Sequence, residues 1–100
     1  MTRDLSRLLR PSSVAIIGGG AWCRLVLEQL TKSAFGGEIW LVHPKGGQID
    51  GRAVFPDLAA LPMAPDAAFI GVNRDATIQI VAELSNMNAG GAVCFGLVTV

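Results

Sequence analysis

The chain has 100 residues, of which 51% are hydrophobic, and its 8 basic and 8 acidic residues leave no formal net charge. This length and composition predict one domain with one modest core. The balanced charge, with no basic stripe interleaved with aromatic residues, argues against nucleic-acid binding. No apolar run approaches the roughly 20 residues of a membrane-spanning helix, and no signal-peptide core follows the N-terminus, so we expect a cytoplasmic protein without a membrane partner.

Side chains that commonly carry chemistry are sparse. The two cysteines, Cys23 and Cys94, have neither metal-site spacing nor the density of a disulfide scaffold, which favours a reducing compartment. Cys94 lies in an apolar run and is predicted to be a small core residue. The single histidine, His43, has no partners in a Ser-His-Asp order or a metal cluster. We therefore predict no catalytic residue and no metal site.

The predicted elements alternate between strands and helices. A lead-in over residues 1–12 precedes a domain over residues 13–100, which begins with an apolar run typical of a strand buried on both faces. The predicted order is a strand over 14–18, a helix over 21–34, a strand over 38–42, a loop over 43–47, a strand over 52–55, a brief helix over 57–61, a strand over 67–72, a helix over 75–87 and a strand over 92–95. This alternation predicts an α/β fold, a Rossmann-like doubly wound parallel sheet in a single three-layer domain.

Three glycines follow the first predicted strand. They let the backbone turn tightly and approach a ligand, and the N–H groups at the start of the next helix favour a phosphate. The dinucleotide fingerprint G-x-G-x-x-G is incomplete because Cys23 stands at the third glycine position. The motif predicts either a nucleotide-bearing cofactor or a plain structural turn. Its candidate binding residues are Gly18, Gly19, Gly20, Ala21 and Trp22.

Two further loops are expected to join this glycine loop. In an open doubly wound sheet, the ligand lies outside the carboxyl ends of the strands where the strand order reverses. NAD-binding domains usually have an acidic residue after the second strand, whereas Lys45 in this position favours a phosphorylated ribose, as in NADP or coenzyme A. The candidate residues of these two loops are His43, Pro44 and Lys45 after the second strand, and Asn73 and Arg74 after the strand over 67–72.

Several segments together carry a family resemblance. They are residues 9–18 (LRPSSVAIIG), residues 42–45 (VHPK) where the family commonly has V-N-P-K, and residues 55–62 (FPDLAALP) followed by 64–68 (APDAA). Over roughly residues 8–95 the chain resembles the CoA-binding domain at the N-terminus of NDP-forming acyl-CoA synthetases, which is similar to the alpha subunit of succinyl-CoA synthetase. The resemblance implies a Rossmann-like fold with the glycine loop near the CoA diphosphate, Lys45 near the nucleotide's phosphates and the loop after 67–72 near the pantetheine arm.

The chain departs from the family pattern at several places, one of which is Asn73-Arg74, where many relatives have a small residue after proline. Residues 19–23 replace the more usual A-S and a longer glycine-containing loop, and His43 stands in place of asparagine. In the family, a phosphohistidine and an ATP-grasp domain follow in later domains, whereas this chain ends at Val100. The resemblance therefore implies a C-terminally truncated CoA-binding part of an acid-CoA ligase. Such a part needs further domains or a companion subunit for catalysis.

Three candidate side chains have structural alternatives to ligand binding. Trp22 either stacks on the adenine or closes the mouth of the site, or else it packs against the sheet. Arg74 either contacts a phosphate or is a solvated residue beside a helix start. Asn73 is a good helix N-cap, which alone would explain its presence.

Three functions remain open at the level of sequence. The first is binding of CoA or acyl-CoA, and the second is an NADP-binding domain of an oxidoreductase. The third is an inert truncated product, because a chain ending after the last strand would leave a sheet edge uncovered and an apolar tail over residues 96–100. That reading predicts self-association, which a clean monomer in light scattering at high concentration would contradict.

Overall fold

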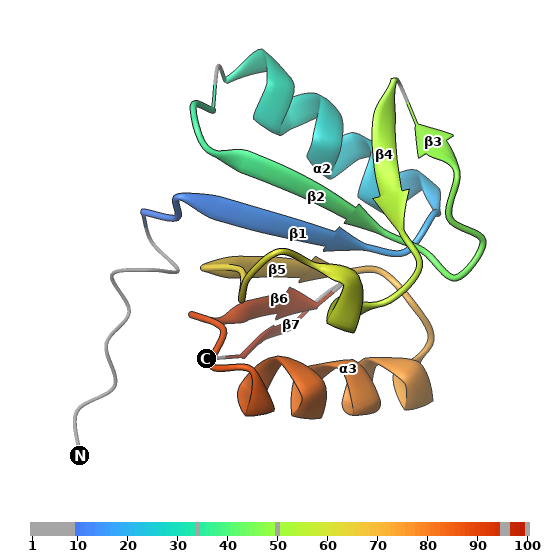
Figure 1. Ribbon diagram of the computed structural model, residues 1–100, viewed down its shortest axis with the longest axis vertical. Helices are drawn as coiled ribbons and strands as arrows, with labels where there is room; N and C mark the ends of the chain where they lie inside the picture. The colour runs from blue at the N-terminus through green and yellow to red at the C-terminus, as the bar shows by residue number, and fades with distance from the viewer. Residues whose placement is uncertain (1–9, 34, 50, 95–96, 100) are drawn as a thin grey trace.

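The computed structural model describes residues 10–33, 35–49, 51–94 and 97–99. Their centre is a 7-stranded sheet with the order β3-β4-β2-β1-β5-β6-β7 (Figure 1). The strands are β1 (Ser13–Ile17), β2 (Glu38–Val42), β3 (Gln48–Ile49), β4 (Arg52–Phe55), β5 (Ala67–Ile70), β6 (Ala92–Cys94) and β7 (Leu97–Thr99). The pairs of β1 with β2 and β5, of β2 with β4 and of β5 with β6 are parallel, whereas β3 and β7 pair antiparallel at the two edges.

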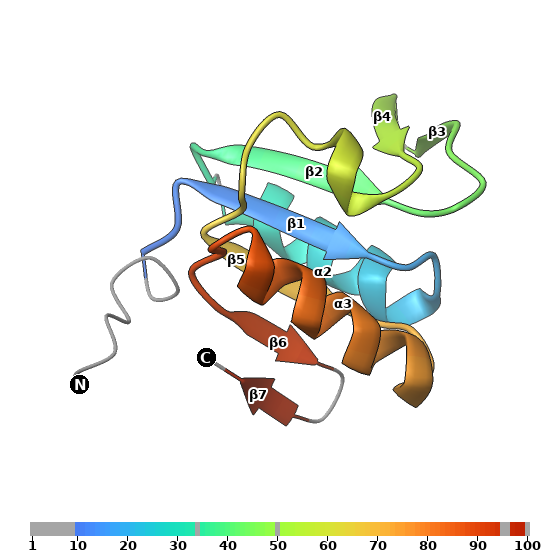
Figure 2. The same ribbon diagram turned by 60° about the horizontal axis from the view of Figure 1, so that its bottom comes forward.

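Helices cover both faces of this sheet. Helix α2 (Ala21–Lys32) lies on one face, and α3 (Arg74–Asn86) lies with the 3-10 helix η1 (Leu58–Ala60) on the other (Figures 1 and 2). Two buried clusters fill the spaces between the layers. Cys23 and Leu27 of α2 belong to one cluster, while Leu84 of α3 and Leu58 of η1 belong to the other. This arrangement confirms the three-layer Rossmann-like fold.

Strand β1 is the centre of the topology. All five of its residues are buried, as expected for a strand with a helical layer on each face. From β1 the chain passes through α2 to β2 on one side, and it later crosses to β5 on the other side of β1. The strand order therefore reverses between β1 and β5. In folds of this kind, the crevice at the carboxyl ends of those two strands is where ligands bind.

Most predicted elements exist, with shifted ends. The predicted strands over 38–42 and 52–55 match β2 and β4, and the predicted loop over 43–47 separates β2 from β3. The strand predicted to run to residue 72 ends at Ile70, so the loop after it begins earlier, at Gly71. The lead-in over residues 1–9, the helix end at Ala34 and the strand end at Phe95 lie outside the described residues.

The sequence interpretation missed both edge strands. Strand β3 forms a short antiparallel hairpin with β4, and β7 pairs antiparallel with β6. The strand over 92–95 is therefore not the last strand of the sheet, because the backbone of β7 pairs with it. Strand β7 takes the edge position instead, and self-association stays a prediction.

Candidate functional site

Gly18 turns the chain from β1 toward α2. Its φ of 121° is a conformation that residues with a side chain rarely adopt, and its N–H donates to the carbonyl of Val42 at 2.9 Å. A Cβ at this position would lie 2.6 Å from the carbonyl oxygen of Gly71. Gly18 therefore allows the ends of β1, β2 and β5 to come together at the carboxyl edge of the sheet.

Gly19 brings the glycine loop against the loop after β2. A Cβ at Gly19 would lie 2.9 Å from Cδ2 and 3.1 Å from Nε2 of His43, so the imidazole occupies the space beside this glycine. Gly20 has open space around it, with nothing within 4 Å of its would-be Cβ. Two of the three predicted loops thus meet through a direct contact between Gly19 and His43.

His43 also organises the turn that carries Lys45. Its N–H donates to the carbonyl of Phe55 at 2.9 Å, and its own carbonyl accepts from the N–H of Gly46 at 2.9 Å. Its Nδ1 accepts a hydrogen bond from the N–H of Lys45 at 3.1 Å. Pro44 and Lys45 are exposed in this turn. A cationic side chain is therefore presented to solvent next to the glycine loop.

The third loop contacts the glycine loop through Gly71 rather than through Asn73 or Arg74. Gly71 donates to the carbonyl of Ile17 at 2.9 Å, and its carbonyl lies against Gly18. The sequence interpretation missed Gly71, although an isolated glycine at the end of an apolar run is a known sign of close backbone approach. Asn73 Oδ1 accepts from the N–H of Ala76 at 2.9 Å, which confirms its role as the α3 N-cap.

Arg74 is the first residue of α3 and is exposed. No described hydrogen bond or ion pair links it to the glycine loop, so its contact with a phosphate stays a prediction. Its place at the carboxyl edge keeps it among the candidate residues, because α3 begins directly after the loop that contacts Gly18.

Trp22 lies in the first turn of α2 and packs on the sheet. Its ring centroid lies 6.3 Å from that of Phe69, with a tilt of 57° between the rings. A Cβ on Gly71 would come within 2.8 Å of the indole carbon Cε3. The ring is only partly buried. Trp22 therefore packs against the sheet, as one of its predicted roles requires. Stacking of its ring on an adenine stays a prediction.

Cys23 stands at the third position of the fingerprint and closes the packing of α2 on the sheet. The residue is 4% exposed, and its thiol donates to the carbonyl of Ile17 at 3.4 Å. Burial raises the pKa of this thiol, and nearby backbone donors at Gly20 and Gly71 counter part of that effect. Cys94 is 6% exposed in the core, as predicted.

The N-terminus of α2 faces this edge without acidic groups. Gly20 is its N-cap and makes no side-chain capping hydrogen bond, and the first turn contains no acidic residue. A helix N-terminus carries a partial positive charge, and it attracts anions. Together with Lys45 nearby, it makes this part of the molecule suited to a phosphate-bearing ligand.

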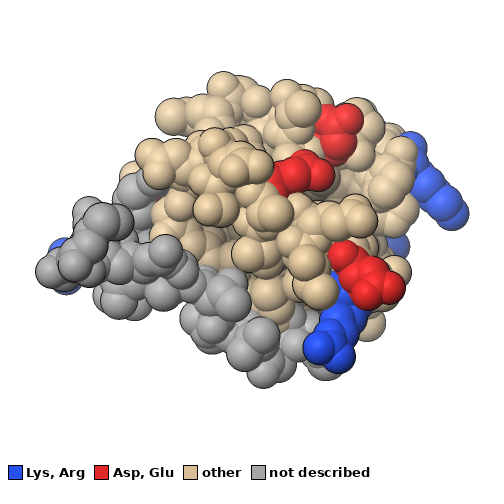
Figure 3. Space-filling view, turned by 90° about the horizontal axis from the view of Figure 1, so that it is seen from below, with Lys and Arg blue, Asp and Glu red and all other residues tan. Residues whose placement is uncertain are grey.

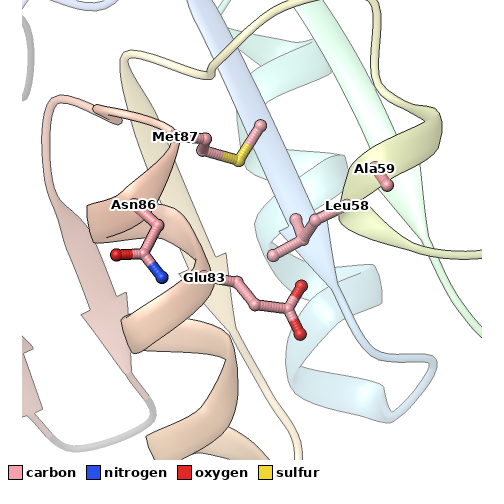
Figure 4. Close-up of a pocket in the computed structure, with 5 residues that line it drawn as sticks. All are labelled: Leu58, Ala59, Glu83, Asn86 and Met87. Carbon is pink, nitrogen blue, oxygen red and sulfur yellow. The ribbon is translucent and has the colours of Figure 1, made fainter.

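A separate hollow of about 290 Å³ lies between η1 and α3. Leu58 and Ala59 approach it from η1, and Glu83 and Asn86 of α3 approach it together with the C-cap residue Met87 (Figure 4). None of these residues is a predicted site residue. The hollow lies at the C-terminal end of α3, whereas the candidate site lies where that helix begins.

On the face seen in Figure 3, the described acidic and basic side chains are few and scattered. Within the described residues, no helix is both long enough and apolar enough to cross a membrane. The same residues hold no group of three or more His, Cys, Asp or Glu side chains arranged for a metal ion.

Comparison with known proteins identifies relatives of the whole domain. A trans-feruloyl-CoA synthase from an unknown prokaryotic organism is 34% identical over 97 residues, which is 93% of this chain and 14% of that protein. An ADP-forming acetate–CoA ligase of Archaeoglobus fulgidus is 29% identical over 94 residues, which is 90% of this chain and 14% of that protein. The chain thus spans 14% of the length of these curated relatives.

A solved structure has the same fold. The dinucleotide-forming acetyl-coenzyme A synthetase 1 of Candidatus Korarchaeum cryptofilum, in complex with phosphate and ADP, superposes with a TM-score of 0.80 at 24% identity, covering 89% of this chain and 20% of that one. The comparisons give no support to the oxidoreductase alternative. A family model described as a CoA binding domain matches residues 12–97. The chain therefore belongs to the family of CoA-binding domains.

Proposed function

We propose that this domain binds coenzyme A at the carboxyl edge of β1 and β5. Backbone N–H groups of the glycine loop and the start of α2, over residues 19–22, hold the diphosphate, and the ammonium group of Lys45 pairs with the 3′-phosphate of the ribose. The loop that begins at Gly71 lies beside the pantetheine arm. Arg74 adds a second cation at the start of α3.

The observation that carries this proposal is the meeting of three loops at the point where the strand order reverses. Gly18 contacts Gly71 and Gly19 contacts His43, so three chain segments far apart in sequence share one edge. That edge contains an α2 N-terminus without a side-chain cap and an exposed lysine. Membership of the CoA-binding family supports coenzyme A as the ligand in this proposal.

We further infer that the domain serves an acyl-CoA synthetase of the ADP-forming type. The named relatives are CoA ligases or synthases of which this chain matches a minor part. In this proposal the acid and nucleotide steps belong to other domains or to a companion chain in the cytoplasm, and this domain supplies bound CoA as the acyl acceptor.

Isothermal titration of the folded chain with CoA, dephospho-CoA, NADP and NAD tests the proposal. We expect CoA to bind most tightly, dephospho-CoA less tightly because it lacks the 3′-phosphate, and both nicotinamide cofactors weakly. A preference for NADP would contradict the proposal and favour an oxidoreductase domain. A folded chain that binds none of the four ligands would likewise contradict the proposed function.

A further inference from the structure

His43 contacts two parts of the candidate site with two different edges of its ring. The Nδ1 edge accepts the hydrogen bond from Lys45 N–H at 3.1 Å. An imidazole nitrogen that accepts a hydrogen bond carries no proton, so in the neutral ring the proton is on Nε2. The Cδ2–Nε2 edge lies against Gly19. One ring thus spans the space between the lysine turn and the glycine loop.

The three glycines of the loop differ in their backbone conformation and in what a side chain at each position would meet. Gly18 has a positive φ and lies against a backbone carbonyl. The backbone at Gly19 is outside the left-handed region, and the atoms closest to its would-be Cβ belong to the His43 side chain. Gly20 has neither constraint. At residue 19, the obstacle to a side chain is therefore the imidazole and not the backbone.

The position of the ring is itself fixed by the backbone. The N–H of His43 extends the β2–β4 pairing through Phe55, and its carbonyl closes the turn at Gly46. The ring cannot turn away from Gly19 without losing the bond from Lys45. A methyl group on residue 19 would therefore displace either the glycine loop or the lysine turn, because 2.9 Å is shorter than a carbon–carbon contact allows.

We propose that His43 is a positioning residue, which sets the distance between the glycine loop and the Lys45 turn, and that its ring is what requires glycine at residue 19. The proposal rests on the CoA site proposed above. In that site the diphosphate and the 3′-phosphate belong to one ligand, so the two loops that hold them must keep a fixed separation. His43 acts on the ligand through Gly19 and Lys45.

A double-mutant cycle tests this coupling. The four forms are the wild type, Gly19→Ala, His43→Asn and the double variant, and each is measured by CoA titration and by thermal unfolding. We expect Gly19→Ala alone to weaken CoA binding about tenfold and to lower Tm, because the new methyl group meets the ring. Asparagine keeps an acceptor for Lys45 N–H but removes the ring. We expect Gly19→Ala to cost less than about twofold in that background.

A matched control separates steric coupling from any general sensitivity of the loop. Gly20→Ala introduces the same methyl group one residue later, where nothing lies within 4 Å. We expect its effect on CoA binding and Tm to be equal in the wild-type and His43→Asn backgrounds. A loss from Gly19→Ala that is likewise equal in both backgrounds would overturn the proposal, because glycine would then be required by the backbone or the ligand.

A second measurement distinguishes positioning from simple loss of structure. His43→Ala removes both contacts of the ring, and we expect the preference for CoA over dephospho-CoA to fall about threefold or more, as Lys45 is no longer held at its distance. An equal loss of affinity for both ligands would contradict a positioning role. A wild-type chain that fails to bind CoA would instead contradict the proposed function, and the Tm values of the cycle would still decide whether the ring requires glycine at residue 19.

Discussion

The two ends of the central strands differ in how their polar groups are used. At the amino end of β1, the carboxylate of Asp66 accepts from Ser12 N–H at 2.8 Å, and Asp66 N–H donates to Ser13 Oγ at 3.0 Å. At the carboxyl end of β1, backbone atoms of Gly18 and Gly71 lie close together, the Cys23 thiol donates to the Ile17 carbonyl, and the nearby Lys45 side chain is exposed. Asp66 and Ser13 thus join two chain segments by side-chain hydrogen bonds at the amino end, while at the carboxyl end Gly18 and Gly71 let the backbones of β1 and the loop after β5 approach closely.

The helices that begin at the carboxyl edge show the same contrast on a smaller scale. Asn73 caps α3 with its side chain, whereas the N-cap of α2 is Gly20, which has no side chain to do so. Side-chain capping satisfies helix N–H groups from within the protein, and its lack at α2 suits an external anion. The proposed function predicts that the amino edge serves stability and that the glycine-rich part of the carboxyl edge serves binding.

Gly18→Ala is expected to have the largest effect, because it lowers both the stability of the fold and the affinity for CoA. The added Cβ would meet the carbonyl oxygen of Gly71 at 2.6 Å in a backbone conformation with φ of 121°. We expect a loss of about 3 kcal/mol in the free energy of unfolding, and loss of CoA binding with it. Urea denaturation measures the first and titration the second. A Gly18→Ala chain of unchanged stability would show that the strand ends need not approach so closely.

Lys45→Ala is expected to affect binding alone. Removal of the ammonium group should weaken CoA binding about tenfold and dephospho-CoA binding much less, because only CoA carries the 3′-phosphate. The exposed position of Lys45 predicts an unchanged Tm. Lys45→Arg keeps the charge and serves as the matched control. Equal losses for both ligands would mean that Lys45 does not contact the 3′-phosphate.

Asp66→Ala is expected to affect stability alone. The substitution removes the acceptor of Ser12 N–H at the amino edge, which we expect to lower the free energy of unfolding by about 1 kcal/mol. The affinity for CoA should stay the same, since Asp66 precedes β5 at the opposite end of the sheet. Asp66→Asn retains an acceptor oxygen and should recover much of the loss. Weaker CoA binding by Asp66→Ala would contradict the assignment of stability to the amino edge and of binding to the carboxyl edge.

The smallest expected effect concerns the Cys23 thiol and pH. Burial raises its pKa in the folded state, so the folded state holds the thiol proton more tightly than the unfolded chain does. The stability from the protonated thiol is complete below the unfolded pKa and is lost as the pH rises through the alkaline range. We expect Cys23→Ala to reduce the alkaline decrease in the free energy of unfolding, as measured by urea denaturation at neutral and alkaline pH. The same alkaline decrease in both forms would assign it to other groups.

The sequence predicts the elements because their signals are local. The apolar run of β1 and the N-cap at Asn73 are each readable within a few residues, and both are confirmed. The edge strands β3 and β7 were missed because segments of two or three residues carry a weak local signal, and only the apolar run over residues 92–95 made the equally short β6 predictable. Their existence depends on β4 and β6 offering unpaired backbone groups beside them.

Some features of the candidate site could likewise be predicted from the sequence, and others could not. Alternation of strands and helices fixes which loops lie at the carboxyl edge, so the glycine loop and the loop of His43 and Lys45 were expected to meet. The sequence does not show that Gly71 makes the third contact, or that the Trp22 ring packs on Phe69. These depend on where β5 ends and on how closely α2 packs against the sheet.

The sequence by itself determined the fold class, the helix starts and the loops that carry glycine and lysine, because hydrophobic periodicity and turn chemistry act between neighbours in the chain. Only the tertiary structure decided that the His43 ring fills the space beside Gly19 and holds the N–H of Lys45. That contact joins residues from the ends of two parallel strands. Its distance is set by the packing of a whole β-α-β unit rather than by any local preference.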